Sequence, residues 1–101
     1  MVRHVILWKL KESLSEDEKK KISADMKTHL EGLVGKVPGL IRLEVGTMPL
    51  ESSNADVMLD SVLESEEALK GYAVHPEHVY VADTYVRPYT EIRMCLDYEK
   101  K

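Results

Sequence analysis

The spacing of the apolar residues switches between two and about four along this chain, and the order of the switches limits the folds open to it. Alternation is typical of a strand, and a spacing near four is typical of a helix with one buried side. The expected elements are, in order, a strand over 2–11, a helix opened by Ser15 and stopped at Gly35, strands over 40–47 and 56–63, a helix capped by Ser65 that runs to about Ala73, a helix begun at Pro76 that runs to about Tyr85, and a strand over 89–98. This β-α-β-β-α-β order predicts an α+β, ferredoxin-like fold with a four-stranded antiparallel sheet.

Cap and turn residues agree with these boundaries. Ser15 is followed three residues later by Glu18, which is the pattern of a capping box. Pro76 disfavours helix at the residue before it and suits the first position of a new helix. His75 is therefore expected at a bend, where it caps the second part of a broken helical segment.

Composition bounds the class of protein. A chain of 101 residues with 44% hydrophobic and 32% charged residues predicts one folded domain over 1–101 rather than a disordered chain. No apolar run approaches the roughly 18 residues of a membrane span. Charges within the first strand argue against a signal peptide. The net charge of −4 argues against a nucleic-acid partner. The single cysteine, Cys95, excludes an internal disulfide framework, and we expect a cytoplasmic protein.

One face of the expected sheet has no helix to cover it. Two helices on one side leave the other side to water or to a partner. On that face we expect Val5, Leu7 and Met58 beside Arg42, Glu44, Asp60, Arg93 and Asp97. Such a mixed face predicts a symmetric homodimer, in which each buried charge is paired across or within the dimer.

Five short segments of the chain resemble one known family: Arg3-His4-Val5-Ile6-Leu7-Trp8-Lys9-Leu10-Lys11, Val37-Pro38-Gly39-Leu40, Glu44-Val45-Gly46, Tyr72-Ala73-Val74-His75-Pro76-Glu77-His78 and Cys95-Leu96-Asp97-Tyr98. In their order and spacing they are similar to the stress-responsive A/B barrel (Dabb) family of dimeric α+β barrel proteins. The resemblance spans nearly the whole chain and implies a ferredoxin-like protomer that pairs into a dimeric barrel. It implies no single activity, because the fold also carries monooxygenases, isomerases and decarboxylating enzymes.

His78 and Tyr72 are the candidate catalytic residues. His78 lies in the first turn of the helix begun by Pro76, where the positive helix end and burial both lower the pKa of an imidazole and leave it a neutral base. The plant polyketide-cyclase branch of the family uses a matching His as base and a matching Tyr as donor to the substrate carbonyl. That branch has a further His on its third strand, where this chain has Val57-Met58-Leu59. The structural alternative is that His78 bonds a backbone carbonyl and holds the bend.

A pocket between sheet and helices is the candidate binding site. His4, Trp8 and Tyr80 are its expected ligand-binding residues. His4 is expected on the helix-facing side of the first strand, where it could also touch His78. The alternative is that the same side chains only fill the core, with His4 bonded to a neighbour.

No metal site and no cofactor are expected. His75 and His78 have a ligand-like spacing, but Pro76 separates them, and no cysteine or acidic set completes a ligand shell in the sequence. Cys95 is interpreted as a structural thiol. No glycine-rich phosphate loop or nucleophile elbow is present.

Two main functions remain open from the sequence. In the first, the domain binds or converts a small apolar carbonyl compound, as a cofactor-free cyclase, isomerase or lyase with His78 and Tyr72 in the pocket. In the second, it is a non-catalytic, stress-associated structural dimer. A weaker third possibility is a cofactor-free monooxygenase. An enclosed cavity reached by both His78 and Tyr72 would separate the first from the second.

Overall fold

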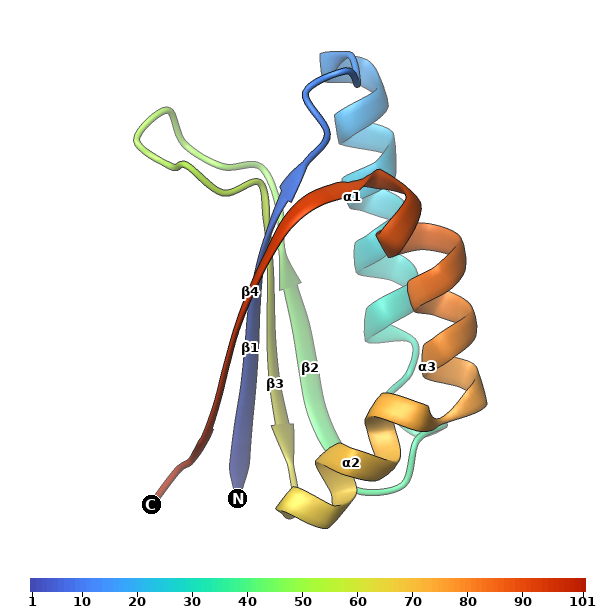
Figure 1. Cartoon of the computed structure of the whole chain (residues 1–101). Helices are drawn as coiled ribbons and strands as arrows, with labels where there is room; N and C mark the ends of the chain where they lie inside the picture. The colour runs from blue at the N-terminus through green and yellow to red at the C-terminus, as the bar shows by residue number, and fades with distance from the viewer.

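A single four-stranded antiparallel sheet carries all the helices on one of its faces (Figure 1). The computed structural model describes all residues from Met1 to Lys101. The strands are β1 (Val2–Leu10), β2 (Leu40–Gly46), β3 (Val57–Leu63) and β4 (Thr90–Glu99), in the spatial order β2-β3-β1-β4. The ferredoxin-like α+β fold expected from the sequence is confirmed.

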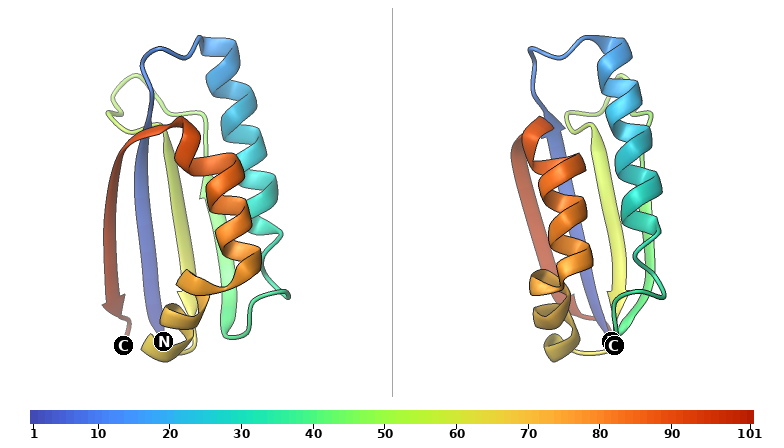
Figure 2. Two further views of the ribbon diagram at one scale, coloured as in Figure 1. Left: turned by 45° about the vertical axis from the view of Figure 1, so that its right-hand side comes forward. Right: turned by 90° about the vertical axis from the view of Figure 1, so that its right-hand side faces the viewer.

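Three helices and two short helical turns form the second layer. They are α1 (Glu16–Glu31), α2 (Glu66–Val74), α3 (Pro76–Val81), a π-helical turn η1 (Ala82–Val86) and a 3₁₀ turn η2 (Arg87–Tyr89). Figure 2 shows α1 and α3 side by side over the same face of the sheet. The helix expected to reach Gly35 ends at Glu31, and Leu33 then packs into the core from a turn. No helix has the length and apolar character needed to cross a membrane.

Local caps fix where the helices begin. The Ser15 hydroxyl accepts the Glu18 amide at 3.1 Å, and the Glu18 carboxylate accepts the Ser15 amide at 2.9 Å, so the capping box is confirmed. At the break between α2 and α3, His75 Nδ1 accepts the Glu77 amide at 3.1 Å. The bend at His75-Pro76 is therefore held by the capping interaction expected from the sequence.

The hydrophobic core lies between the sheet and the helices. Alternate residues of β1 point into it, because successive side chains of a strand face opposite ways. Trp8 is 4% exposed and Tyr72, from α2, is 2% exposed. Around them pack aliphatic residues from every strand but β4 and from α1, α3 and η1, chiefly Ile6, Leu10, Met26, Leu30, Leu43, Val45, Val57, Leu59, Leu63, Val81 and Val86.

The register between β1 and β4 corrects one prediction. Leu96 pairs with Val5, whereas Arg93 pairs with Trp8 and Asp97 with His4. Paired residues project to the same side of a sheet, so Arg93 and Asp97 face the helices. Their expected position on the open face, and the cross-dimer pairing argued for them there, are wrong. The sequence of β4 alone does not determine which of its two faces turns toward the helices, because that choice depends on its pairing with β1.

The open face is more apolar than the sequence suggested. Besides Val5, Leu7 and Met58, it carries four side chains of β4 in place of Arg93 and Asp97: Ile92, Met94, Leu96 and Tyr98.

The remaining charges of that face pair within the chain. Two guanidinium nitrogens of Arg3 donate to Asp60 Oδ1, at 3.0 and 2.6 Å. Arg42 lies 3.3 Å from a Glu44 oxygen and 3.7 Å from the other Asp60 oxygen.

The pairing of β2 with β3 shifts register between Leu40 and Arg42. The shift leaves Ile41 exposed while Leu40 and Leu43 are buried. Strict alternation along this strand would put Ile41 on the same face as Leu43 and Val45, but only the latter two are buried. A bulge changes the face of the residues on one side of it.

Candidate functional site

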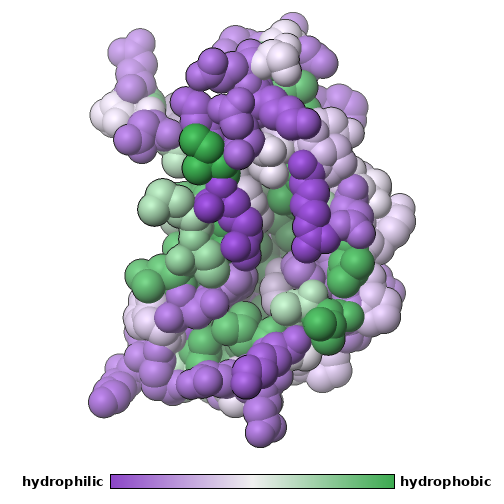
Figure 3. Space-filling model, in the orientation of Figure 1, coloured by the Kyte–Doolittle hydropathy of each residue, from purple (hydrophilic) through white to green (hydrophobic).

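A cavity of about 430 Å³ lies between the sheet and the helices, on the side of β4. Figure 3 shows this side of the molecule hollowed between the strands and the helical layer. The inner wall is apolar, with Ile6, Trp8 and Leu59 from the sheet. The polar groups that reach the cavity come from five different elements: His4, Tyr72, His78, Arg87, Arg93 and Asp97, with Lys70 and Thr90 beside them.

Tyr72 brings a buried, unpartnered hydroxyl to this cavity. Its oxygen makes no hydrogen bond. Burial raises the pKa of Tyr72 well above its usual value, against an opposing effect of the Arg93 charge. The hydroxyl therefore stays protonated at every physiological pH and is available as a donor.

His78 lies against Tyr72, with the two ring centroids 4.2 Å apart. Burial lowers the pKa of His78, and the nearby positive charge of Arg87 adds to this effect, while a backbone hydrogen bond opposes it. That bond joins His78 Nδ1 to the Ala73 carbonyl oxygen at 3.3 Å. A carbonyl can only accept, so in the neutral ring Nδ1 carries the proton and Nε2 carries the free lone pair.

His4 enters the site from β1 and is held by its neighbours. It is 6% exposed, and its backbone carbonyl accepts the Ser61 hydroxyl at 2.9 Å. Its Nδ1 bonds the Asp97 carboxylate. Its ring lies edge-on to Tyr72, with centroids 5.9 Å apart. His4 thus joins the cavity beside Tyr72, and it also has the hydrogen-bonded neighbour that the core interpretation expected.

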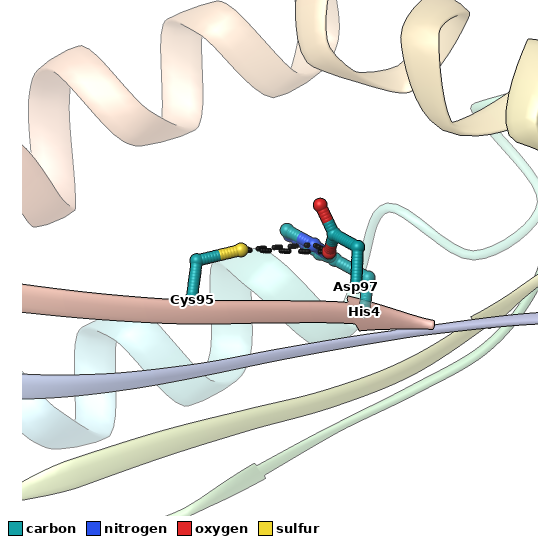
Figure 4. A group of neighbouring side chains, drawn as sticks. All are labelled: His4, Cys95 and Asp97. Atoms are coloured by element: carbon teal, nitrogen blue, oxygen red, sulfur yellow. Dashed lines mark hydrogen bonds and ion pairs between the residues drawn. The ribbon is translucent and has the colours of Figure 1, made fainter. Parts of the chain in front are cut away.

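Sequence reasoning missed the two partners of His4 on β4. Cys95 Sγ lies 3.7 Å from His4 Nδ1 and 3.4 Å from Asp97 Oδ1. In Figure 4 all three side chains rise from the strands toward the helices. These donors could hold a metal ion, because the atoms lie within 4.8 Å of one another. The only signal in the sequence was the alternation that puts Cys95 and Asp97 on one face of their strand.

Of the two remaining residues predicted to bind a ligand, only one lies at the cavity. Trp8 lines the cavity, whereas Tyr80 is 59% exposed and lies outside it, edge-on to Tyr85. The structure thus does not bring Tyr80 to the site. From the third-strand stretch where the plant branch has a histidine, Leu59 faces the cavity. No imidazole enters from β3.

The two arginines that line the cavity differ in their ion pairing. Arg87 forms an ion pair with Asp83, one turn earlier. Arg93 makes no ion pair, and its charge acts on His78 and on Tyr72.

Comparison with known proteins agrees with this architecture. The family model described as Stress Responsive A/B Barrel Domain matches residues 2–100. A dimeric protein of unknown function and ferredoxin-like fold from Bacteroides fragilis is 30% identical, with a TM-score of 0.92 over 98% of this chain and 95% of that one. A comparison with curated protein sequences finds no match.

Two more distant solved structures share the fold. A Dabb family protein with a ferredoxin-like fold from Mesorhizobium loti is 20% identical, with a TM-score of 0.74 over 99% of this chain and 96% of that one. A hydroxynitrile lyase from Passiflora edulis is 20% identical, with a TM-score of 0.72 over 96% of this chain and 90% of that one.

Proposed function

The chain belongs to the stress-responsive A/B barrel family, and from this premise we propose that it binds and converts a small apolar carbonyl compound in the cavity between sheet and helices. The family by itself assigns no reaction, so the proposal depends on the chemistry of the site. Tyr72 donates a hydrogen bond to the carbonyl oxygen, and His78 removes a proton next to that carbonyl. The reaction class is general acid–base catalysis without an organic cofactor.

The unpartnered Tyr72 hydroxyl is the observation that carries this proposal. A buried hydroxyl without a partner costs about 1–3 kcal/mol, so proteins normally satisfy such a group. Tyr72 is 2% exposed and its oxygen has no partner in the protein, although it borders a cavity of about 430 Å³. A ligand oxygen in that cavity would supply the missing acceptor. The apolar wall around it favours an otherwise apolar ligand.

His78 supplies the second half of the chemistry. Its lowered pKa keeps the ring neutral near pH 7, and its bond to Ala73 leaves Nε2 as the basic nitrogen. The two ring centroids lie 4.2 Å apart, which supports the proposal that a base acts beside a hydrogen-bond donor. This pair is the minimum needed to remove a proton and to stabilise the enolate oxygen that forms.

The same hydrogen bond favours the second candidate function, a non-catalytic structural dimer. In that interpretation the bond from His78 to Ala73 only holds the bend between α2 and α3. It accounts for one ring nitrogen of His78 but leaves the Tyr72 hydroxyl unexplained.

We also propose that the working form is a homodimer closed over the open sheet face. The relative from Bacteroides fragilis is described as dimeric, and the apolar residues of β4 on that face support the same arrangement here. The helix-side cavity lies on the opposite side of the sheet.

Deuterium exchange tests the proposed chemistry. Acetophenone in D₂O serves as the probe, and incorporation of deuterium into its methyl group is followed by proton NMR. We expect the protein to accelerate exchange, and Tyr72→Phe and His78→Gln each to reduce that acceleration by roughly 10²-fold or more. Tyr80→Phe and His29→Gln are the matched controls, because both residues lie outside the cavity.

Stability separates the two candidate functions in the same variants. Since the Tyr72 hydroxyl bonds nothing, Tyr72→Phe should leave the free energy of unfolding unchanged or raise it. Loss of about 1–3 kcal/mol in both variants, with no exchange above background in the wild-type protein, would support the structural dimer instead.

A further inference from the structure

We propose that His4, Cys95 and Asp97 form a three-ligand site for a zinc-like divalent metal ion at the rim of the cavity. The three donor atoms are His4 Nδ1, Cys95 Sγ and an Asp97 carboxylate oxygen, all within 4.8 Å of one another (Figure 4). The proposal stands on the geometry of these groups and is independent of the carbonyl chemistry at Tyr72 and His78.

The distances from the Cys95 sulfur to the other two donor atoms are close to those between ligands of one zinc ion. Zinc takes thiolate sulfur at about 2.3 Å and imidazole nitrogen or carboxylate oxygen at about 2.0–2.2 Å, which puts tetrahedral ligands roughly 3.3–3.6 Å apart. Cys95 Sγ lies 3.7 Å from His4 Nδ1 and 3.4 Å from Asp97 Oδ1. His4 Nδ1 and Asp97 are hydrogen-bonded to each other, and an ion would take the place of the proton on Nδ1, which in the neutral ring moves to Nε2.

The shared use of one nitrogen argues against a nucleophilic triad. In such a triad the nucleophile contacts one imidazole nitrogen, and the orienting carboxylate contacts the other. Here the thiol and the carboxylate both approach Nδ1 of His4. Three donors that converge on one point are what a metal ion needs.

The chemistry of the donor set selects the class of ion. A neutral imidazole, a thiolate and a carboxylate together carry a charge of −2, which neutralises a divalent cation. Thiolate and imidazole select zinc or cobalt over magnesium or calcium, which prefer oxygen ligands. Binding releases the Cys95 thiol proton, and the Nδ1 proton of neutral His4 moves to Nε2, so that Nδ1 is free to bind the ion.

The surroundings of the three ligands leave a fourth coordination position open on the proposed ion. His4 is fixed by its burial and by the Ser61 bond to its backbone, so one ligand is preorganised. Cys95 is exposed, and Asp97 is half-exposed, with 40% of its side chain accessible, so an ion could enter from solvent. Since His4 and Asp97 line the cavity, the fourth position can take water or an oxygen atom of a cavity ligand.

Cobalt titration tests this site directly. Untagged protein, reduced and freed of metal, is titrated with Co²⁺ while absorbance is recorded. We expect one equivalent to produce a sulfur-to-cobalt charge-transfer band and the intense visible bands of tetrahedral cobalt, both lost on addition of excess Zn²⁺. Zinc alone should raise the melting temperature as its concentration rises.

Two exposed ligands allow variants that keep the fold. Cys95→Ser should abolish the charge-transfer band, and Asp97→Asn should weaken cobalt binding by roughly tenfold or more. Glu67→Gln is the matched control, because it removes one negative charge from an exposed position in α2. Circular dichroism checks that all three variants are folded.

Three results would overturn the proposal. They are the absence of tetrahedral cobalt bands in the wild-type protein, an unchanged spectrum in Cys95→Ser, and equal cobalt affinities in Asp97→Asn and Glu67→Gln. Each is read without acetophenone, so failure here leaves the proposed carbonyl chemistry standing, and failure of deuterium exchange leaves this site standing.

Discussion

Burial acts in opposite directions on the protons of Tyr72 and His78. It raises the pKa of the phenol and lowers the pKa of the imidazole, so both groups are neutral near pH 7. One is then a donor with a proton to offer, and the other is a base with a free lone pair. Pairs of titratable groups with divergent environments are typical of acid–base sites. The contact between these two rings is therefore the residue-level feature most worth testing.

The charge of Arg93 should be measurable through the pKa of His78. Arg93 faces the cavity without an ion-pair partner and is one of the positive charges that lower that pKa. We expect Arg93→Gln to raise the pKa of His78, as followed by NMR titration of the ring protons. A pKa that stays the same or falls would show that the Arg93 charge does not reach His78.

The lowered pKa of His78 should also make the free energy of unfolding depend on pH. The unfolded chain takes up its His78 proton near pH 6.5, whereas the folded chain takes it up only at lower pH. Between these two values the unfolded chain binds more protons, so the free energy of unfolding falls as the pH drops through that window. His78→Gln should flatten this slope in urea unfolding between about pH 7.5 and about 5.5.

At the scale of elements, tight turns decide how the helices meet the sheet. The turn before β2 uses Gly39 with φ +81°, a left-handed conformation that favours glycine. A Cβ added at Gly39 would lie 2.6 Å from the Cβ of Ala68 on α2. The turn therefore sets the approach of α2 to the strand, and with it the position of Tyr72.

Gly39→Ala should destabilise the protein more than Gly35→Ala. Gly35 also has a positive φ, of +92°, but a Cβ there meets nothing within 4 Å. Strain alone predicts a loss of about 1–2 kcal/mol at Gly35. Strain with overpacking predicts about 2–4 kcal/mol at Gly39. Urea unfolding measures both, and equal losses would mean that α2 moves aside without cost.

At the scale of the whole molecule, the two faces of the sheet differ in what covers them. One face builds the core and the cavity. The other leaves Leu96 62% and Met94 67% exposed, with Ile92 and Leu7 nearby. An apolar patch of this kind is typical of an interface between proteins. In the proposed symmetric dimer, a second copy of the same patch would cover it.

Light scattering should therefore give a mass near twice 11.5 kDa at micromolar concentration. A stable interface of this kind buries on the order of 1,500 Å² or more. Leu96→Asp should shift the protein to a single chain, because it buries an unpaired charge in the interface. Val74→Asp is the matched control, since Val74 is 75% exposed on α2. Dissociation by both variants, or by neither, would place the interface elsewhere.

Local sequence signals determined the order of elements, their caps and the inward face of β1. The Ser15–Glu18 box, the His75-Pro76 bend and the alternation of His4 and Trp8 depend on residues close together in the chain. Such short-range patterns can be interpreted without the fold. Together with the family resemblance, they predicted that His4, Trp8, Tyr72 and His78 lie near one pocket, and all four line the same cavity.

Only the tertiary structure decided what stands beside His4. Asp97 is 93 residues away in the chain, and it reaches His4 because β4 pairs with β1 in one particular register. In β4 polar and apolar residues alternate, and no β4 side chain is buried in the single chain. Neither the alternation nor the burial of its side chains therefore identifies which face of β4 turns toward the helices. The register shift between Lys9 and Leu10 was equally invisible in the sequence. A shift of one residue exchanges the two faces of a strand, and long-range pairing alone fixes that choice.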